Sequence, residues 1–415
     1  MITVDEALNE VLQAVSPLGV EKAGIMDALG RVLGEDIYAR RSIPPRDNSA
    51  MDGIVLRSID SRGASPQEPV RLRLVEEIPA GHIPIREIGP FEVSKIMTGA
   101  PIPSGGDTVI RLEEIKEDGP DILIFAEAKP GRDIRKSGED VREGELVIPK
   151  GEVIRPAEIG MLASLGYSFL YVYQRPLVAV IATGNELVDI DEAPTSWSII
   201  TSNSYSLASQ ILECRAIPLQ MGIARDTREE IRRKFQAAGR ADVIISSGGV
   251  SVGAYDLVRE VIEEAGEGIQ FWQVAMRPGK PFAFGRIATK PFFGLPGNPV
   301  SAMISFEQFV RPVLLKMMGH RKLFRRMVRA RLAEDISKKR GVKNFIRAHV
   351  TLEDGVYTAY TTGDQGSGIL KSMVKANGLI ILPEDVTRVA QGEEVMVQLI
   401  DHSLNQVPDI SYPGS

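Results

Sequence analysis

Hydrophobic residues at the start of the chain recur at the spacing of an amphipathic helix. One side of that helix would carry Ala7, Leu8, Val11, Leu12 and Val15. A second helical pattern covers roughly Gly24 to Leu33. The tandem prolines at 44–45 then interrupt regular structure, because proline fixes φ and lacks an N–H donor. The chain is therefore predicted to open with two helices.

From about residue 54 to 134 the pattern changes to short alternating runs. Val70 to Val75 alternates with period two, as expected of a half-buried strand. The apolar runs at 110–112 and 122–125 are separated by residues 116–120, which form a turn candidate. This region is predicted to be a β-rich module. A helical pattern returns from Arg155 to Leu165, with Pro156 in the first turn.

Residues 176 to 320 alternate between strand and helix patterns. The apolar run Leu177 to Ala182 is typical of a strand buried on both faces of a parallel sheet, and Val243 to Ser246 is similar. Helices are expected after Ser202 or Asn203, either of which can act as the N-cap, and after the Asn298-Pro299 pair. Further elements are predicted as a strand at 217–223 and helices at 227–238 and 256–265. The alternation predicts an α/β domain with a parallel sheet.

The C-terminal part has an all-β pattern. Met327 to Leu332 alternates, and the runs at 347–352 and 356–360 flank Glu353-Asp354-Gly355. Asp-Gly between two alternating runs is a strong hairpin signal. Residues 393–400 form another strand candidate. We expect a small barrel or sandwich here.

Composition narrows the class of protein. A length of 415 residues predicts two to four domains, and 43% hydrophobic with 25% charged residues is average for globular proteins. A net charge of −6 argues against wholesale binding of nucleic acid or membrane surfaces. No stretch of 18 uninterrupted apolar residues and no signal peptide is found, which favours a cytoplasmic enzyme.

The cysteine and histidine content limits the metal chemistry. Cys214 is the only cysteine, so the chain forms neither an intramolecular disulfide nor a thiolate metal cluster. The cysteine lies within a helix pattern and is predicted to be a buried core residue. The four histidines are scattered without ligand-like spacing. Any metal is therefore expected to have oxygen ligands.

Three segments follow predicted strands of the α/β domain, where ligands bind in open sheets. They are Thr183 to Glu186, Ser246 to Gly253, and Pro296 to Ser301. The second contains Ser247, Gly248, Gly249 and Ser251, and its bare backbone could approach an anion. The alternative is an ordinary glycine turn between strand and helix. It matches neither the Walker pattern nor the Gly-x-Gly-x-x-Gly dinucleotide pattern.

Charged residues near these segments give further candidates. Arg277 and Lys280 lie on a chain stiffened by two prolines, which suits an oxyanion, although a solvated basic turn is the alternative. Glu186, Asp226 and Asp256 follow strands or open a helix, and carboxylates beside a phosphate site suit Mg²⁺. The alternative for Asp256 is a helix N-cap, and for the other two an ordinary loop acid.

Six motifs in order resemble one known family. They are Ser-Ala-Met-Asp-Gly at 49–53, Met-Thr-Gly-Ala-Pro at 97–101, Ile-Arg-Lys-Ser-Gly-Glu-Asp at 134–140, Ala-Thr-Gly-Asn-Glu-Leu at 182–187, Ser-Gly-Gly-Val-Ser-Val-Gly at 247–253 and Leu-Pro-Gly-Asn-Pro-Val-Ser at 295–301. From spacing alone, the first three are only turns. Together the six resemble the molybdopterin molybdenumtransferase (MoeA) family, which includes the E domain of gephyrin and its plant counterpart.

The resemblance implies a multidomain α/β fold and a homodimer. The implied parts are an elongated helical segment (1–45 plus 141–175), a β-rich module (46–140), an α/β molybdopterin-binding domain (176–320), a C-terminal β barrel (321–402) and a tail (403–415). The implied reaction is the Mg²⁺-dependent hydrolysis of adenylylated molybdopterin, with insertion of molybdate or tungstate into the dithiolene and release of AMP. The implied pathway partner is the molybdopterin adenylyltransferase.

The resemblance also implies roles for individual residues. Asp52, Thr98, Arg135 and Asp140 resemble residues that the β-rich module contributes to a partner's cleft. Glu186, Asp226 and Asp256 resemble the acids of the metal and nucleotide site, beside Ser247, Gly248, Gly249, Ser251, Pro296 and Pro299. The oxyanion-binding set would be Arg277, Lys280, Ser301, Arg347 and Ser367.

Two positions depart from the family pattern. Arg277 stands where lysine is usual, which keeps the charge but changes the donor geometry. Asn185 stands where aspartate is common, so a direct metal role for it is not expected. The alternatives are the adenylyltransferase, a small single domain without the β module and barrel, and a gephyrin-like scaffold.

Overall fold

The structure, a computed structural model, describes residues 1–249, 255–264, 268–287, 289–401 and 403–405. The chain divides into two compact units. The first unit comprises Met1–Glu21 with Tyr173–Ser415, and the second comprises Lys22–Val172. Among the described residues, no helix is long and apolar enough to span a bilayer. The finer division into four parts stays a prediction.

A six-stranded sheet lies at the centre of the first unit, in the order β16-β13-β17-β21-β20-β18. Its strands are β13 (Leu177–Thr183), β16 (Ile217–Ala224), β17 (Val243–Ser247), β18 (Ile269–Gln273), β20 (Pro281–Ile287) and β21 (Lys290–Leu295). The first four strands in this order are parallel, whereas β20 is antiparallel to both β21 and β18. The expectation of a parallel sheet is therefore wrong for β20, which runs against the other five strands. Only residues 288–289 separate β20 from β21, and so short a connection joins antiparallel strands.

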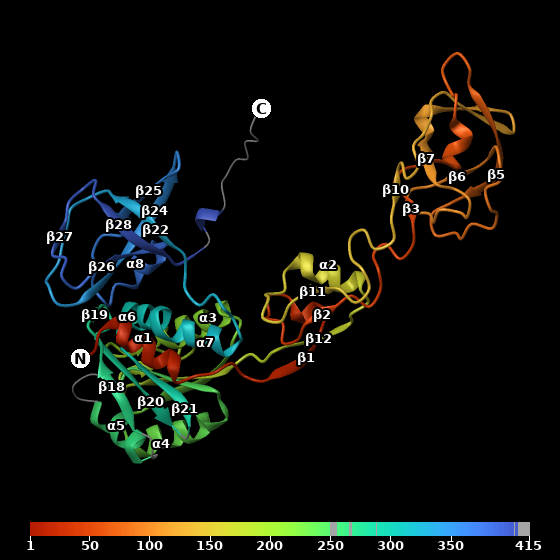
Figure 1. The fold of residues 1–415 in the computed structure, drawn as a ribbon. Helices are drawn as coiled ribbons and strands as arrows, with labels where there is room; N and C mark the ends of the chain where they lie inside the picture. The colour runs from red at the N-terminus through yellow and green to blue at the C-terminus, as the bar shows by residue number, and fades with distance from the viewer. Residues whose placement is uncertain (250–254, 265–267, 288, 402, 406–415) are drawn as a thin grey trace. The chain divides into compact units, whose positions relative to one another are not determined.

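Helices cover both faces of this sheet (Figure 1). They are α1 (Val4–Gln13), α3 (Ser202–Glu213), α4 (Arg228–Ala237), α5 (Tyr255–Glu264), α6 (Pro299–Ser305) and α7 (Arg311–Met317), the last two joined by a π-helical turn at Phe306–Val310. Val178 and Val180 face the core shared with α1, α3, α6 and α7, whereas Ala179 and Ile181 face α4 and α5. The predicted burial of β13 on both faces is confirmed.

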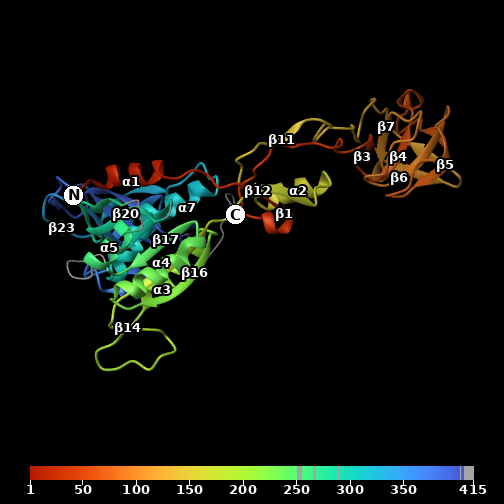
Figure 2. The same ribbon diagram turned by 90° about the horizontal axis from the view of Figure 1, so that it is seen from below.

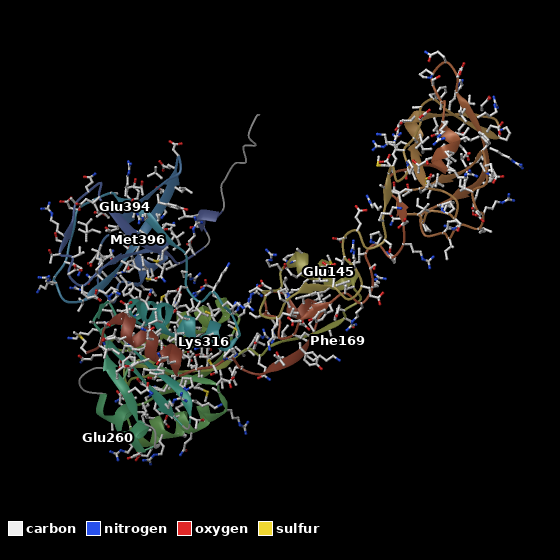
Figure 3. The ribbon with its side chains drawn as sticks, in the orientation of Figure 1. Glu145, Phe169, Glu260, Lys316, Glu394 and Met396 are labelled. Atoms are coloured by element: carbon white, nitrogen blue, oxygen red, sulfur yellow. The ribbon has the colours of Figure 1, made fainter. Side chains whose placement is uncertain are left out.

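Helix α1 is part of this α/β body. Thr3 and Glu6 form a capping box, in which each side chain accepts a hydrogen bond from the other's backbone N–H. Val11 is fully buried in the common core. Lys316 on α7 donates from Nζ to the Leu12 carbonyl at 2.7 Å; its position is labelled in Figure 3. The first predicted helix is therefore confirmed.

The second predicted helix is wrong. Residues Val20–Gly24 form a strand, β1, which pairs with β12 (Phe169–Tyr173), and only Met26–Ala28 form a short 3-10 turn. The strand partner lies far away in sequence, so the local helical spacing is overridden by tertiary pairing. An elongated N-terminal segment that is mainly helical is consequently not found.

The second unit contains a six-stranded sheet in the order β7-β4-β6-β5-β9-β8. Its strands are β4 (Gly53–Leu56), β5 (Val70–Ile78), β6 (Glu92–Ile96), β7 (Thr108–Arg111), β8 (Ile115–Asp118) and β9 (Asp121–Ile124). The remaining elements are β2 (Ile37–Tyr38), β3 (Asn48–Ser49), β10 (Ile134–Arg135), β11 (Leu146–Ile148) and α2 (Pro156–Ser164). The β-rich module and the helix with Pro156 in its first turn are confirmed. The turn between β8 and β9 is shorter than predicted, at 119–120.

The C-terminal strands of the first unit form a closed barrel. They are β22 (Met327–Leu332), β24 (Lys343–Glu353), β25 (Val356–Thr361), β26 (Gly378–Leu382) and β28 (Glu394–Leu399). The barrel closes because β24 pairs with both β25 and β26. Asp354 and Gly355 form the predicted hairpin turn, with φ values of 49° and 78°. Of the two expected architectures, the barrel is the one observed.

Smaller elements complete the first unit. They are β14 (Leu187–Val188), β15 (Ile199–Ile200), β19 (Met276–Arg277), β23 (Ile336–Ser337), β27 (Arg388–Val389) and α8 (Leu370–Val374). Strand β19 pairs with β24, so the chain that leads into β20 also forms an edge of the barrel sheet. Figure 2 shows the chain after β14 leaving the body of the first unit as an extended loop.

Gly53 allows the close approach of two strands, which yields a stability prediction. A Cβ atom at this position in β4 would lie 2.1 Å from the Ile110 carbonyl oxygen of β7. We expect Gly53→Ala to lower the free energy of unfolding by more than about 2 kcal/mol, because backbone would have to move. The matched control is Gly160→Ala on α2, where a Cβ meets nothing within 4 Å. The control should be neutral or stabilising by about 1 kcal/mol in urea unfolding. Equal stability of the two variants would contradict the prediction.

Cys214 gives a second prediction. It is 6% exposed in the main core, as expected from the sequence, and burial raises the pKa of its thiol to about 12. Thiolate is the reactive form, so a disulfide reagent should react far more slowly with the folded protein than with the urea-unfolded chain at about pH 8. Raising the pH towards the ordinary thiol pKa should accelerate only the reaction of the unfolded chain. Rapid, stoichiometric labelling of the folded protein would contradict the prediction.

Candidate functional site

A cavity of about 560 Å³ lies at the carboxyl edge of the parallel strands in the first unit. Thr183 ends β13 and Ser247 ends β17, while Pro296 directly follows β21; all three line the cavity. These strands are neighbours in the sheet, so their ends converge at one edge. Among the sequence candidates, the cavity is lined by Glu186, Asp226, Ser247, Gly248, Gly249, Pro296 and Pro299.

The glycine pair forms tight backbone contacts within this edge. Gly248 and Gly249 have φ values of 92° and 70°, which favour glycine. A Cβ atom on Gly248 would lie 2.6 Å from the Thr183 carbonyl oxygen. The Gly248 N–H donates to the Leu295 carbonyl at 3.0 Å, so it continues the sheet instead of offering a donor to an anion. The expectation of an exposed amide is wrong at Gly248. Ser251 and its neighbours lie outside the described residues.

Two of the three predicted acids line the cavity. Asp226 follows β16, and its carboxylate accepts the Asn185 N–H at 3.2 Å, while Asn185 Oδ1 accepts the Asp226 N–H at 3.1 Å. Asn185 thus holds Asp226 in place. The Glu186 carboxylate lies close to Gly184 in its own loop. A Cβ atom built on Gly184 would be only 2.6 Å from that carboxylate. The side chain of Asp256 lies outside the described residues. Within the described part of the chain, no group of three or more Asp, Glu, His or Cys side chains is gathered as in a complete metal site.

The basic residues lie beside the cavity and not in its wall. Arg277 pairs with Asn344 of the barrel through β19 and β24, and both Arg277 and Lys280 are exposed. Pro281, directly after Lys280, lines the cavity. The segment therefore joins the cavity edge to the barrel.

The barrel contributes a loop at 362–368 to the same region. The Ser367 carbonyl accepts the Val300 N–H at 3.2 Å, and its hydroxyl accepts from Asn298 Nδ2 at 3.0 Å. Asn298 precedes α6 and Pro299 occupies its first turn, as predicted, but the Asn298 side chain binds Ser367 instead of capping the helix. Ser301 lies buried in that first turn. Gly368 lines the cavity.

Arg347, on strand β24 of the barrel, braces this loop. It is 1% exposed, and it donates from Nε to Ser372 Oγ and from Nη2 to the Gly366 carbonyl, both at 3.0 Å. Burial lowers the pKa of Arg347 to about 10, so it stays charged at neutral pH. Among the predicted oxyanion residues, Arg347 and Ser367 are therefore joined through one loop.

Four predicted residues lie in the second unit. Asp52 Oδ1 accepts hydrogen bonds from the Thr98 N–H at 2.7 Å and the Thr98 hydroxyl at 2.8 Å, and these bonds lower the pKa of Asp52. The motifs at 49–53 and 97–101, which contain Asp52 and Thr98, therefore lie next to each other. Arg135 lies on β10, opposite Asn48 of β3, and Asp140 lies in the exposed loop that follows.

Asn203 was missed as a cavity residue by the sequence analysis, which treated it as a helix cap. The N-cap of α3 is Thr201, and the Asn203 side chain lies in the cavity wall. Its Nδ2 donates to Ser247 Oγ at 2.7 Å and to the Gly297 carbonyl at 2.8 Å. Capping and inward binding use the same residue type, so the spacing could not separate them.

The fold and the cavity define a multidomain α/β protein that can bind a ligand at the carboxyl edge of its sheet. Family sequence profiles agree with this class. They match residues 2–166 as "MoeA N-terminal region (domain I and II)", residues 179–316 as "Probable molybdopterin binding domain" and residues 329–400 as "MoeA C-terminal region (domain IV)".

Relatives that match almost the whole chain show the family to which it belongs. The chain is 39% identical over 394 residues to molybdopterin molybdenumtransferase 2 of Mycobacterium tuberculosis, covering 94% of this chain and 96% of that protein. It is 36% identical over 414 residues to the molybdopterin molybdenumtransferase of Haemophilus influenzae, covering 97% and 100%. A crystal structure of a Pyrococcus horikoshii molybdopterin biosynthesis MoeA protein has a TM-score of 0.84 at 33% identity, covering 97% of this chain and 99% of the other. The chain belongs to the molybdopterin molybdenumtransferase (MoeA) family.

The brace around Arg347 can be tested by substitution. Lysine keeps the positive charge but cannot donate to both Ser372 and Gly366 with the same geometry, so Arg347→Lys should loosen the 362–368 loop. Amide hydrogen exchange in that loop should accelerate by about tenfold, the effect of losing one hydrogen bond. Arg329→Lys, on an exposed ion pair with Glu394, is the control and should leave the loop unchanged. Unaltered exchange in Arg347→Lys would refute the bracing role.

Proposed function

We propose that this chain is a molybdopterin molybdenumtransferase, which inserts molybdate or tungstate into molybdopterin and releases AMP from its adenylylated form. The observation that carries the proposal is one cavity edge with two carboxylates, Glu186 and Asp226, next to a basic segment with Arg277 and Lys280. Full-length relatives named for this activity support it. These relatives match almost the whole chain, which disfavours the adenylyltransferase, because that protein is a small single domain. Nothing in the described residues specifically favours a scaffold role.

The carboxylates fit a magnesium ion that shares phosphate oxygens with a substrate. Mg²⁺ prefers oxygen ligands and is commonly held by one or two carboxylates together with substrate phosphates. Glu186 and Asp226 supply two such carboxylates at the cavity, and Asp256 is the proposed third acid. Bound there, Mg²⁺ would neutralise phosphate charge and favour hydrolysis of the adenylate. Asn185 would keep Asp226 oriented, because the two residues bind each other's backbone.

The proposed oxyanion site uses residues from both the α/β domain and the barrel. Arg277 and Lys280 would supply charge, and the hydroxyl groups of Ser301 and Ser367 would donate hydrogen bonds to molybdate. Arg347, tied to Ser372 and Gly366, would act by fixing the loop that carries Ser367. Ser247, Gly248, Gly249, Ser251, Pro296 and Pro299 would form the wall on the pterin side.

We further propose that the enzyme works as a homodimer in the cytoplasm and receives its substrate from the adenylyltransferase. In this proposal, Asp52, Thr98, Arg135 and Asp140 of one copy complete the cleft of the other. The two hydrogen bonds that Thr98 donates to Asp52 support a preformed pair at the surface of the second unit. The four-part domain division belongs to the same proposal.

The test measures AMP release from adenylylated molybdopterin with Mg²⁺ and either oxyanion. Asp226→Asn keeps the shape of the side chain but removes its charge, so it should lower oxyanion-stimulated AMP release by about tenfold or more, given that metal-bound carboxylates contribute charge that an amide lacks. Glu229→Gln, an exposed position on the neighbouring helix α4, is the matched control and should retain full activity. Absence of AMP release by the folded wild-type protein would overturn the proposed function. Full activity of Asp226→Asn would overturn only the role of Asp226.

A further inference from the structure

Arg225 binds the backbone of the loop that carries Glu186. The residue follows β16 directly and is half-buried. Its Nη1 donates hydrogen bonds to the carbonyl oxygens of Leu187, Asn185 and Gly184, at 2.8, 3.1 and 3.5 Å respectively. These three acceptors lie on both sides of Glu186 in the chain. One guanidinium nitrogen therefore fixes the backbone that leads into and out of this residue.

Further hydrogen bonds join this loop to the end of β16. The fourth carbonyl of the loop, that of Glu186, accepts the Ile199 N–H at 2.8 Å, so each carbonyl from 184 to 187 has a partner. In the opposite direction, the side chains of Asn185 and Asp226 each accept the other's backbone N–H. The ends of β13 and β16 are therefore joined twice, by the side chain of Arg225 and by that of Asn185.

The charge and the position of Arg225 would affect a bound metal in opposite directions. Glu186 and Asp226 both line the cavity, where they are the proposed ligands of Mg²⁺. A fixed positive charge nearby repels a cation, so its removal by itself would tighten metal binding. A residue that orients the ligands has the reverse effect, because the groups behind metal ligands typically contribute about 10- to 100-fold to metal affinity. The sign of the change distinguishes the two roles.

We propose that Arg225 is a positioning residue for the metal site, which holds the loop so that the carboxylates of Glu186 and Asp226 face one ion. This inference rests on the proposed function, since it takes Mg²⁺ as the ion that the two carboxylates share. Arg225 acts through the backbone and needs no contact with the metal. Its positioning effect outweighs its repulsion, because Glu186 is exposed and Asp226 half-buried, and water weakens the interaction between charges.

Hydrogen exchange tests the hold on the loop without metal or substrate. In Arg225→Ala, the amides of residues 184–188 should exchange about tenfold faster, the effect of losing one hydrogen bond. The matched control is Arg228→Ala, at the start of α4. Arg228 binds the surface carboxylates of Glu260, labelled in Figure 3, and Glu264. This control should leave the exchange of residues 184–188 unchanged.

A Mg²⁺ titration of AMP release from adenylylated molybdopterin tests the consequence for the metal. In Arg225→Ala, the Mg²⁺ concentration that gives the half-maximal rate should rise by about tenfold or more. The corresponding molybdate concentration should change by about twofold or less, because the proposed oxyanion residues do not contact Arg225. Arg228→Ala should leave both concentrations unchanged.

A conservative variant tests the geometry of the three hydrogen bonds. An ammonium group carries three donors on one nitrogen, which suits three carbonyls that converge on one nitrogen. Arg225→Lys should therefore keep the loop exchange and the Mg²⁺ requirement within about threefold of wild type. Thermal unfolding checks that each variant is folded. Should Arg225→Ala fail to fold, the neutral Arg225→Gln takes its place, with the same direction of change expected.

Several outcomes would overturn the inference. They are unchanged exchange at 184–188 in Arg225→Ala, an unchanged or lower Mg²⁺ requirement, and an equal rise in the Mg²⁺ and molybdate requirements. Arg225→Lys as impaired as Arg225→Ala would also overturn it. AMP release by the wild type with an unchanged Mg²⁺ requirement in Arg225→Ala rejects the role of Arg225 alone. No AMP release by the folded wild type rejects the proposed function, and the metal role of Arg225 with it.

Discussion

Close backbone contact between neighbouring parallel strands is the constraint on which the candidate site depends. Gly248 leaves no room for a side chain beside the Thr183 carbonyl, and its N–H continues the sheet by binding Leu295. The ends of β13, β17 and β21 are thereby held together. Gly248 consequently acts on the shape of this edge, because its N–H is already used within the sheet.

A second constraint joins the barrel to this edge. The buried guanidinium of Arg347 is costly to remove from water, and its hydrogen bonds to Ser372 and Gly366 offset part of that cost. The loop that it braces contacts the start of α6 through Ser367. The position of α6 and that of the barrel loop are therefore coupled. An oxyanion held between them would depend on both.

The sequence predicted most of the architecture where a strong local pattern was present. Three patterns each indicate a single kind of structure: the continuous apolar run of β13, the Asp354-Gly355 hairpin and Pro156 at a helix start. The pattern failed at Val20–Gly24, where pairing with a distant strand outweighs helical spacing. It also failed at Asn203, because the same amide that can cap a helix can bind inward. Such choices depend on tertiary neighbours that spacing does not encode.

The mixed character of the sheet has a consequence for function. Because β20 runs against β21, its first residue, Pro281, reaches the same edge at which the parallel strands end. An all-parallel sheet would have put the start of that strand, and Lys280 before it, at the opposite edge.

In the strand order, Glu186 follows β13 and Lys280 precedes β20, with β17 and β21 between them. Three strand spacings amount to about 14 Å. Opposite charges are therefore separated along one edge of the sheet, as the proposed metal site at one end and the proposed oxyanion site at the other would require.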